Sequence, residues 1–495
     1  MQKSFSILFC FFFAILLKAQ FPFTDSAYFY LFGNSGVEEF HAVCNHSLDS
    51  GYVALGTTSG LSNGASDFYL VKTDWTGNTI WSRSFGTEGI ENGTALLETH
   101  DHGFLLGGFT NKTLSGDYDF FVVKTDSNGF AEWTKTYGGS DWDFLRGIAL
   151  APDSGFLLCG QTFSFGNNGA DVYLIRTDKN GDTLWTRTYG GSQNDCANKV
   201  LVTADSFVVM AGFTESNTSG MKDLFLLKCD LATGDTIFTR KAGGAYNDAV
   251  NSICEHRSFD FGWVMVGYSE SFNSNHDKDI WLIKYDTSGN VMWQSSFGSS
   301  SGDDEATCIY PEGYDFFVSG YTPNGSGETD LVAGILNFGG FWLWNQSTSY
   351  GSFEQDLAWA NTKTLRGDYL FAGSTQSFNA SATDALLLLT DSIKVQFQSV
   401  HTSSNSLVGI SEKVDENLQI FPNPACNEVY LTLPGTQQYT SYRIYSTLGQ
   451  ILQRGVFEHQ YNIHSVDIRG LSAGTYYLEC TNEFYHYRAT LIICR

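Results

Sequence analysis

The chain has 495 residues, of which 28 are basic and 53 acidic, giving a formal net charge of −25. A surface of this sign repels nucleic acid and anionic lipid, which argues against a phosphate-binding protein. Hydrophobic residues make up 42% and aromatic residues 15% of the chain, which excludes a disordered protein and provides for a large core.

Residues 1–19 have the pattern of a secretory signal peptide. Lys3 supplies a positive start, an apolar run extends from Phe5 to Leu17, and Ala19 precedes the predicted cleavage before Gln20. The run is too short for a transmembrane helix, and no later segment is long and apolar enough to be one. We therefore expect the mature chain to leave the cytoplasm without a transmembrane segment.

Residues 20–400 consist mostly of a repeat of about 52 residues. Each copy has an aspartate, a strand-like run ending in a basic residue, a turn with glycine and then an aromatic residue, as in DFYLVKTDWTGNTIW. Each period predicts four antiparallel strands. Because one such unit cannot cover its own apolar faces, seven units predict a seven-bladed β-propeller. The copies begin at Asp67, Asp119, Asp171, Asp223, Asp279, Asp330 and Asp384.

The N-terminal segment is predicted to close the ring of blades. Trp81 lies five residues before the corner glycine Gly86, and the next four repeats keep this spacing, whereas Trp344 lies seven residues before Gly351. Tyr28 has the same spacing to Gly33 although no blade precedes it, whereas the last repeat lacks an aromatic outer strand. We expect residues 28–32 to complete blade seven beside residues 385–389, which removes the free edges of the ring.

Nine cysteines remain after the signal peptide, an odd number that cannot pair completely within one chain. Those at matching positions of separate repeats are interpreted as small apolar side chains of inner strands, and no C-x-x-C motif is present. The sequence leaves open whether one or two disulfides form among the nine. The nine are Cys44, Cys159, Cys196, Cys229, Cys254, Cys308, Cys426, Cys480 and Cys494.

An acidic residue follows each corner glycine by five positions, on the face that carries the longer loops. On one interpretation each carboxylate accepts backbone N–H bonds and fixes the corner of its blade. On the other, the acids form a ring that attracts a cation, with oxygen ligands that favour Ca²⁺, or a cationic ligand. Trp142 at the same corners either stacks on a sugar or packs within the protein. The acids are Glu38, Glu91, Asp143, Asp195, Asp248, Asp303 and Asp356.

The repeat ends before a polar, Ser-rich segment at residues 401–416, which is a predicted linker. Residues 417–495 alternate strand and turn signals, which predicts a small Ig-like β-sandwich. They contain the segments FPNP, IYSTLGQ and GLSAGTYY, with Pro422, Asn423, Pro424, Gly449 and Gly474.

These C-terminal segments resemble the sorting domain of cargo proteins of the type IX (Por) secretion system of Bacteroidota. The resemblance implies that an outer-membrane translocon reads this domain and that the domain is typically cleaved. The cargo would then be secreted or held at the cell surface. Phe421 stands where the family often has tyrosine, and the chain ends in Cys494-Arg495 rather than a Lys-rich tail.

Catalytic signatures are weak in this sequence. Residues 298–302 match G-x-S-x-G, but they lie in a loop between blades without the strand–turn–helix of a nucleophile elbow. The sequence therefore favours an all-β, non-catalytic secreted propeller that binds a glycan or a protein through its loop face, with no assigned cofactor. Two alternatives stay open: a glycan hydrolase or lyase on a propeller scaffold, and a structural spacer of the cell surface.

Overall fold

The structure is a computed structural model. It describes residues 27–33, 36–62, 64–111, 116–218, 221–256, 261–299, 302–324, 328–351, 354–377, 383–390, 403–404, 419–421, 423–432, 441–446, 451–456, 463–481 and 486–494. The secondary-structure elements in these ranges are β-strands, and no helix within them is long and apolar enough to cross a membrane. The predicted signal peptide and its Ala19–Gln20 cleavage site lie outside the described residues.

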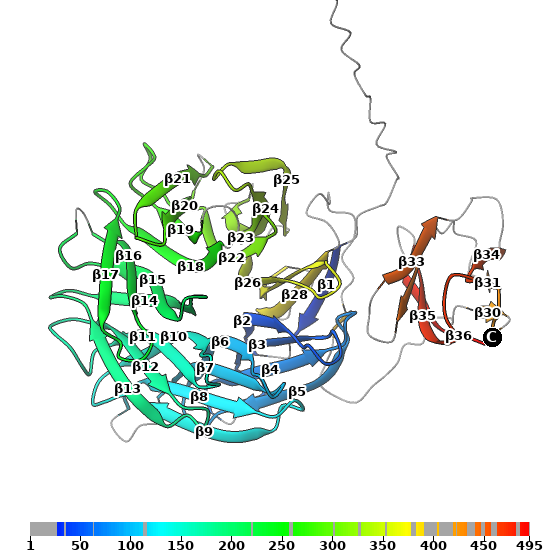
Figure 1. Ribbon diagram of the computed structural model, residues 1–495, viewed down its shortest axis with the longest axis horizontal. Helices are drawn as coiled ribbons and strands as arrows, with labels where there is room; N and C mark the ends of the chain where they lie inside the picture. Colours follow the sequence, from blue (N-terminus) through cyan, green and yellow to red (C-terminus); the bar gives the residue numbers. More distant parts are fainter. Residues whose placement is uncertain are drawn as a thin grey trace, which may run out of the picture.

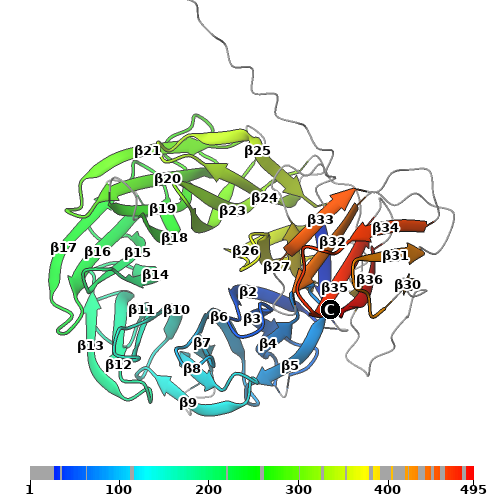
Figure 2. The same cartoon turned by 45° about the vertical axis from the view of Figure 1, so that its right-hand side comes forward.

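Seven sheets arranged around one axis form the predicted propeller (Figure 1, Figure 2). In blades one to six the strands follow chain order from the axis outward. Blade one holds β2 (Glu38–Asn45), β3 (Tyr52–Thr58), β4 (Asp67–Thr73) and β5 (Thr79–Phe85), and blade two holds β6 (Glu91–Glu98), β7 (Phe104–Thr110), β8 (Asp119–Thr125) and β9 (Ala131–Tyr137). Blade three holds β10 (Asp143–Leu150), β11 (Phe156–Thr162), β12 (Asp171–Thr177) and β13 (Thr183–Tyr189), and blade four holds β14 (Asp195–Val202), β15 (Phe207–Thr214), β16 (Asp223–Asp230) and β17 (Thr236–Ala242).

The remaining blades continue the same order. Blade five holds β18 (Asp248–His256), β19 (Gly262–Ser269), β20 (Asp279–Asp286) and β21 (Val291–Phe297); blade six β22 (Glu305–Glu312), β23 (Asp315–Pro323), β24 (Thr329–Leu336) and β25 (Trp342–Tyr350). Blade seven holds β26 (Asp356–Lys363), β27 (Tyr369–Thr375) and β28 (Asp384–Thr390), followed by β1 (Ala27–Phe32) and the short β29 (Ser403–Ser404).

The place of a strand in its blade explains its residue pattern. Second and third strands have sheet neighbours on both sides and blades against both faces, so β8 is buried along its whole length. First strands alternate between buried and half-buried positions, as β6 does. Outer strands such as β9 alternate between exposed and half-buried residues. Apolar side chains of adjacent blades meet in shared clusters, one of which contains Phe68, Leu106 and Val123.

The N-terminal strand closes the ring as predicted. β1 pairs with β28 in an antiparallel register that sets Tyr28 opposite Leu389 and Phe32 opposite Ala385. Phe29 and Leu31 are buried in a cluster shared by blades six and seven. Part of the predicted linker also belongs to this blade, because Ser403 and Ser404 form a parallel pair with β1.

A repeated ion pair fastens the end of blades one to four opposite the longer loops, and it was not predicted from the sequence. The basic residue near the end of the third strand is buried, and it meets an aspartate in the preceding hairpin. The Nζ–carboxylate distance is 2.6 Å for Lys72–Asp49 and 2.9 Å for Lys124–Asp101. Although burial opposes it, hydrogen bonds from Thr99 and Lys124 lower the pKa of Asp101 to about 2.

The C-terminal residues form two small antiparallel sheets. One contains β30 (Gln419–Phe421), β31 (Glu428–Thr432) and β34 (Ile463–Asp467), and the other contains β33 (Ile451–Val456), β32 (Ser441–Ser446), β35 (Gly474–Thr481) and β36 (His486–Ile493). Both contribute to one apolar cluster that includes Val429, Ile444, Leu478 and Leu491. Two sheets over a common core agree with the predicted small β domain, while an Ig-like topology stays a prediction.

Candidate functional site

Six of the seven predicted ring acids begin or flank an innermost strand and are fully buried: Glu38, Glu91, Asp143, Asp195, Asp248 and Asp356. Their carboxylates accept hydrogen bonds from the adjoining loops. Asp143 Oδ2 accepts from Gly139 N and from Ser164 Oγ, each at 2.8 Å. Asp195 Oδ2 has the same pair of donors in blade four, Gly191 N and Ser216 Oγ. This geometry favours the interpretation that the acids fix the corners of the blades.

In blade six the equivalent acid is Asp304, one residue later than the predicted Asp303. Asp304 is 3% exposed and accepts hydrogen bonds from Ser299 N at 2.7 Å and Thr322 Oγ1 at 2.5 Å. Asp303 is exposed and accepts from Lys278 N at 3.1 Å. The corner after Gly298 is one residue longer than its counterparts, so counting from the glycine gave the wrong aspartate.

The acids that begin the third strands lie against the same corners. A Cβ atom on Gly138 would be 2.0 Å from Asp119 Oδ1 and 2.7 Å from Asp143 Oδ2, so only glycine fits between the two carboxylates. Burial first, and then the Asp143 and Asp117 carboxylates, raise the pKa of Asp119 to about 6. Burial also raises the pKa of Asp171, which faces Asp195 at the next corner. Two carboxylates thus flank the corner glycine at five of the seams, at Gly86, Gly138, Gly190, Gly243 and Gly351.

A metal centre is not formed by these acids in the part of the chain that the structure describes. Among those residues, no three His, Cys, Asp or Glu side chains are grouped so that they could hold a metal ion. The Ca²⁺ alternative therefore stays a prediction without a described ligand set.

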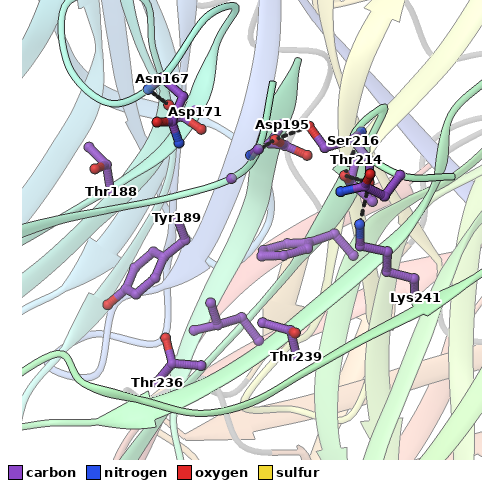
Figure 3. Close-up of a pocket in the computed structure, with 15 residues that line it drawn as sticks. Asn167, Asp171, Thr188, Tyr189, Asp195, Thr214, Ser216, Thr236, Thr239 and Lys241 are labelled. Carbon is purple, nitrogen blue, oxygen red and sulfur yellow. Dashed lines mark hydrogen bonds between the residues drawn. The ribbon is translucent and has the colours of Figure 1, made fainter. Parts of the chain in front are cut away.

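A polar pocket of about 340 Å³ lies at the seam between blades three and four (Figure 3). Asp171, Asp195, Thr188 and Tyr189 line it together with Lys241, whose Nζ donates to the backbone oxygen of Ser216. The acids belong to the two series found in the other blades. Lys241 differs from the repeat, because β5, β9, β13 and β21 have serine or threonine at the register position that Lys241 occupies in β17.

The side chains that differ most from blade to blade gather at the loop end of the inner strands. Three register positions define this surface, which we call the axial rim: the residue after the corner acid, its partner on the second strand, and the residue before the repeat aspartate of the third strand. In blades two to six they are Asn92, Phe109 and Tyr118; Phe144, Gln161 and Ala170; Cys196, Phe213 and Lys222; Ala249, Tyr268 and Lys278; and Glu305, Tyr321 and Thr329.

Five aromatic rings meet between blades two and three, three of them on the rim and two beside it. We call them the aromatic cluster: Phe109, Tyr118 and Phe144 on the rim, and Trp142 and Phe163 beside it. Ring centroids are 5.0 Å apart for Phe109–Phe144, 6.1 Å for Tyr118–Trp142 and 6.4 Å for Trp142–Phe163. Trp142 nevertheless stays 48% exposed and Phe163 39% exposed. Trp142 therefore both packs within the protein and presents a free surface.

Cations stand over aromatic rings along the rest of the rim. Lys222 Nζ lies 4.4 Å from the Phe213 ring centroid, and Lys278 Nζ lies 4.2 Å from that of Tyr268. Such pairs hold a cation and a ring together, so they fix the shape of the rim in blades four and five.

A hydrogen-bond network without a counterpart in the repeat joins blades five and six. Glu305 Oε2 accepts from Tyr321 Oη at 2.6 Å and from Lys278 Nζ at 2.7 Å, and its Oε1 accepts from Asn251 Nδ2 at 2.8 Å. Burial and the Glu305 carboxylate raise the pKa of Tyr321. The phenol therefore keeps its proton, and the carboxylate is occupied by three donors.

Trp142 could be singled out from the sequence, but the axial rim was not predicted. The repeat is defined by the residues that its copies share, whereas the rim consists of positions at which the copies differ. Comparing the residue beside each invariant aspartate, where Tyr118, Lys222 and Lys278 stand, would have found it.

The sorting motif lies at the last strand of the chain. Asn423 Oδ1 accepts a hydrogen bond from Ile492 N at 2.8 Å, and the Asn423–Pro424 peptide is cis. Gly474 begins β35 opposite Ile493. Pro422 and Gly449 are outside the described residues.

Comparison with known families identifies the C-terminal domain. Residues 419–494 match the family described as "Secretion system C-terminal sorting domain". These residues form the C-terminal sorting domain of a Por (type IX) secretion cargo protein. This cargo protein is accordingly secreted to the cell surface or beyond, and its C-terminal domain is the part that the secretion machinery engages.

The propeller is distantly similar to several known proteins. A curated protein, "Regulatory protein FlaEY" of Caulobacter vibrioides, is 26% identical over 171 residues, which cover 30% of this chain and 18% of that protein's length. Among solved structures, Sqt1 from Chaetomium thermophilum has a TM-score of 0.42 at 11% identity, covering 73% of this chain and 98% of its own. The polysaccharide lyase Uly1 has a TM-score of 0.44 at 10% identity, with coverages of 74% and 92%.

Proposed function

We propose that the propeller of this secreted cargo protein is a non-catalytic module that binds a glycan through the aromatic cluster. The observation that carries the proposal is Trp142, which is half exposed although its ring contacts those of Tyr118, Phe144 and Phe163. The positions of Tyr118 and Phe144 are not aromatic in any other blade, as Ala170 and Cys196 illustrate. A framework that repeats seven times does not need them, so a ligand is the simpler reason for their presence.

A glycan suits this surface better than a purely apolar ligand. The C–H faces of a pyranose ring pack on aromatic rings, and its hydroxyl groups need hydrogen-bond acceptors and donors nearby. Asp117 and Asp141 adjoin Tyr118 and Trp142, and Arg146 lies beside Phe144, 5.9 Å from its ring centroid. The cluster thus combines a flat apolar surface with charged groups at its edge.

The network around Glu305 supports binding rather than hydrolysis or β-elimination. A general base needs a free lone pair near the substrate, whereas Glu305 already accepts three hydrogen bonds. Tyr321 has a raised pKa, so it is a poor source of phenolate. The hydrogen bonds from Tyr321, Lys278 and Asn251 to Glu305 instead stiffen the rim between blades five and six.

Binding of the full chain to an array of glycans and proteins tests the proposal. We expect at least one glycan to bind, and the double substitution W142A/F163A to weaken that binding about tenfold or more, because an aromatic contact at a binding site contributes more than about 1 kcal/mol. Phe338→Ala is the matched control, since Phe338 is 61% exposed in a hairpin turn between β24 and β25 and should leave binding unchanged. A melting curve confirms that each variant folds.

Other outcomes reject the proposal in distinct ways. Binding to proteins alone would replace the glycan with a protein ligand, and release of a cleaved glycan would favour the enzyme alternative. A wild-type chain that binds nothing would favour the structural spacer.

We also propose that export begins with a signal peptide at residues 1–19, cleaved between Ala19 and Gln20. The functional propeller then comprises residues 20–400, a linker follows at 401–416, and the sorting domain comprises residues 417–495. N-terminal sequencing of the periplasmic chain tests the first boundary, and a first residue other than Gln20 would move it.

A further inference from the structure

Two cysteines from opposite ends of the sorting domain lie side by side. The Sγ atoms of Cys426 and Cys494 are 3.1 Å apart, although the residues are separated by 68 positions in the chain. Both side chains are exposed. Among the described cysteines of the propeller, Cys159, Cys196, Cys229 and Cys254 are buried in strands.

The backbone holds this pair together independently of the sulfur atoms. Ala425 N donates to Ile492 O and Cys494 N donates to Ala425 O, each at 2.8 Å. Ala425 and Ile493 are also buried in the common core of the two sheets. The two Cys side chains therefore follow from a short parallel bridge between the segment after β30 and the end of β36.

We propose that Cys426 and Cys494 form a disulfide in the exported chain. Disulfides form in the periplasm and outside the cell, and the sorting domain sends this chain there. The oxidant is a disulfide-bearing thiol oxidoreductase or a small-molecule disulfide. One thiolate attacks the oxidant to give a mixed disulfide, and the second displaces the oxidant's thiol. The two cysteines lose two protons and two electrons, and the oxidant is reduced to two thiols.

The bond ties the last strand of the sorting domain to the sorting motif. It closes a loop that contains β31 to β36, and a cross-link over so long a loop restricts the unfolded chain strongly. It uses two of the nine mature cysteines and leaves the remaining seven as thiols.

Peptide mapping of the full-length chain, recovered from a bacterial periplasm and alkylated without reduction, tests the bond. Trypsin should release residues 414–443 joined to residues 489–495, and prior reduction should separate them. Cys426→Ser and Cys494→Ser should each abolish the joined peptide, whereas the control Cys254→Ser should retain it. Recovery of both cysteines in alkylated form from the unreduced wild type would overturn the proposal.

A melting experiment gives a second, independent readout. A reductant should lower the melting temperature of the C-terminal domain within the full chain by more than about 5 °C in the wild type. It should have no such effect in C426S/C494S. Equal melting of the wild type with and without reductant would contradict a bond that constrains the domain.

Discussion

Asp119 is the residue at which the conflict between burial and charge is clearest. Its pKa is raised to about 6 by burial and by the neighbouring carboxylates of Asp143 and Asp117, while in the unfolded chain an aspartate has a pKa near 4. The folded protein therefore binds more protons than the unfolded chain between these two values. Stability must rise as the pH falls through this window, since protonation removes a buried charge.

We expect the propeller to gain about 1 kcal/mol from Asp119 between pH 7 and pH 5. Asp119→Asn keeps the shape of the side chain without its charge, so it should raise the melting temperature at pH 7 and reduce the gain on acidification. Asp303→Asn, at an exposed aspartate of another corner, is the control and should behave as the wild type. A wild-type chain that melts earlier at pH 5 than at pH 7 would contradict this account of the seams.

At more acidic pH the hairpin aspartates act in the opposite direction. The lowered pKa of Asp101 reflects hydrogen bonds that form only in the folded chain. Their contribution is present above pH 4 and is lost as the pH falls towards 2. Stability is therefore expected to be greatest at mildly acidic pH.

Among the elements, β1 has the largest expected effect on stability. It supplies the outer strand of blade seven, and all six of its residues have partners on β28. Deletion of residues 21–33 should expose the β28 edge and the buried surface that Phe29 and Leu31 cover. We expect the melting temperature of the propeller to fall by about 10 °C or more.

A synthetic peptide of residues 27–33 provides the control for this deletion. Added to the truncated chain, it should restore part of the lost melting temperature, because the vacated strand position binds it by pairing with β28. An unchanged melting temperature after the deletion would show that β1 does not hold the ring closed.

The elements were largely predictable because each has a periodic signal. The spacing of Tyr28 to Gly33 located β1, and the recurring aspartates located the third strands. The pairing of Lys72 with Asp49 was not predictable, since nothing in the local pattern of either residue indicates the other. Asp304 was missed for a different reason: one additional residue in a corner shifts the register of a count that starts from the glycine.

At the scale of the whole molecule, the sorting domain and the propeller have separate roles. The sorting domain directs export, and its motif could be recognised in the sequence because Asn423 and Gly474 meet the last strand through specific backbone contacts. We propose that the propeller presents the ligand surface, and its aromatic cluster comes together from four separate stretches of the chain, around Phe109, Tyr118, residues 142–144 and Phe163. Periodicity shows where such stretches begin, but it does not show which variable side chains converge.

Hydrogen exchange of the full chain, with and without a glycan found on the array, tests the location of the binding surface most directly. The account predicts slower exchange on binding in residues 116–119, 141–146 and 162–165, which carry four of the five aromatic residues of the cluster. Exchange in the hairpins at the other end of the blades, such as residues 126–130, should not change. Protection confined to those hairpins or to the sorting domain would contradict the proposal that the axial rim binds the ligand.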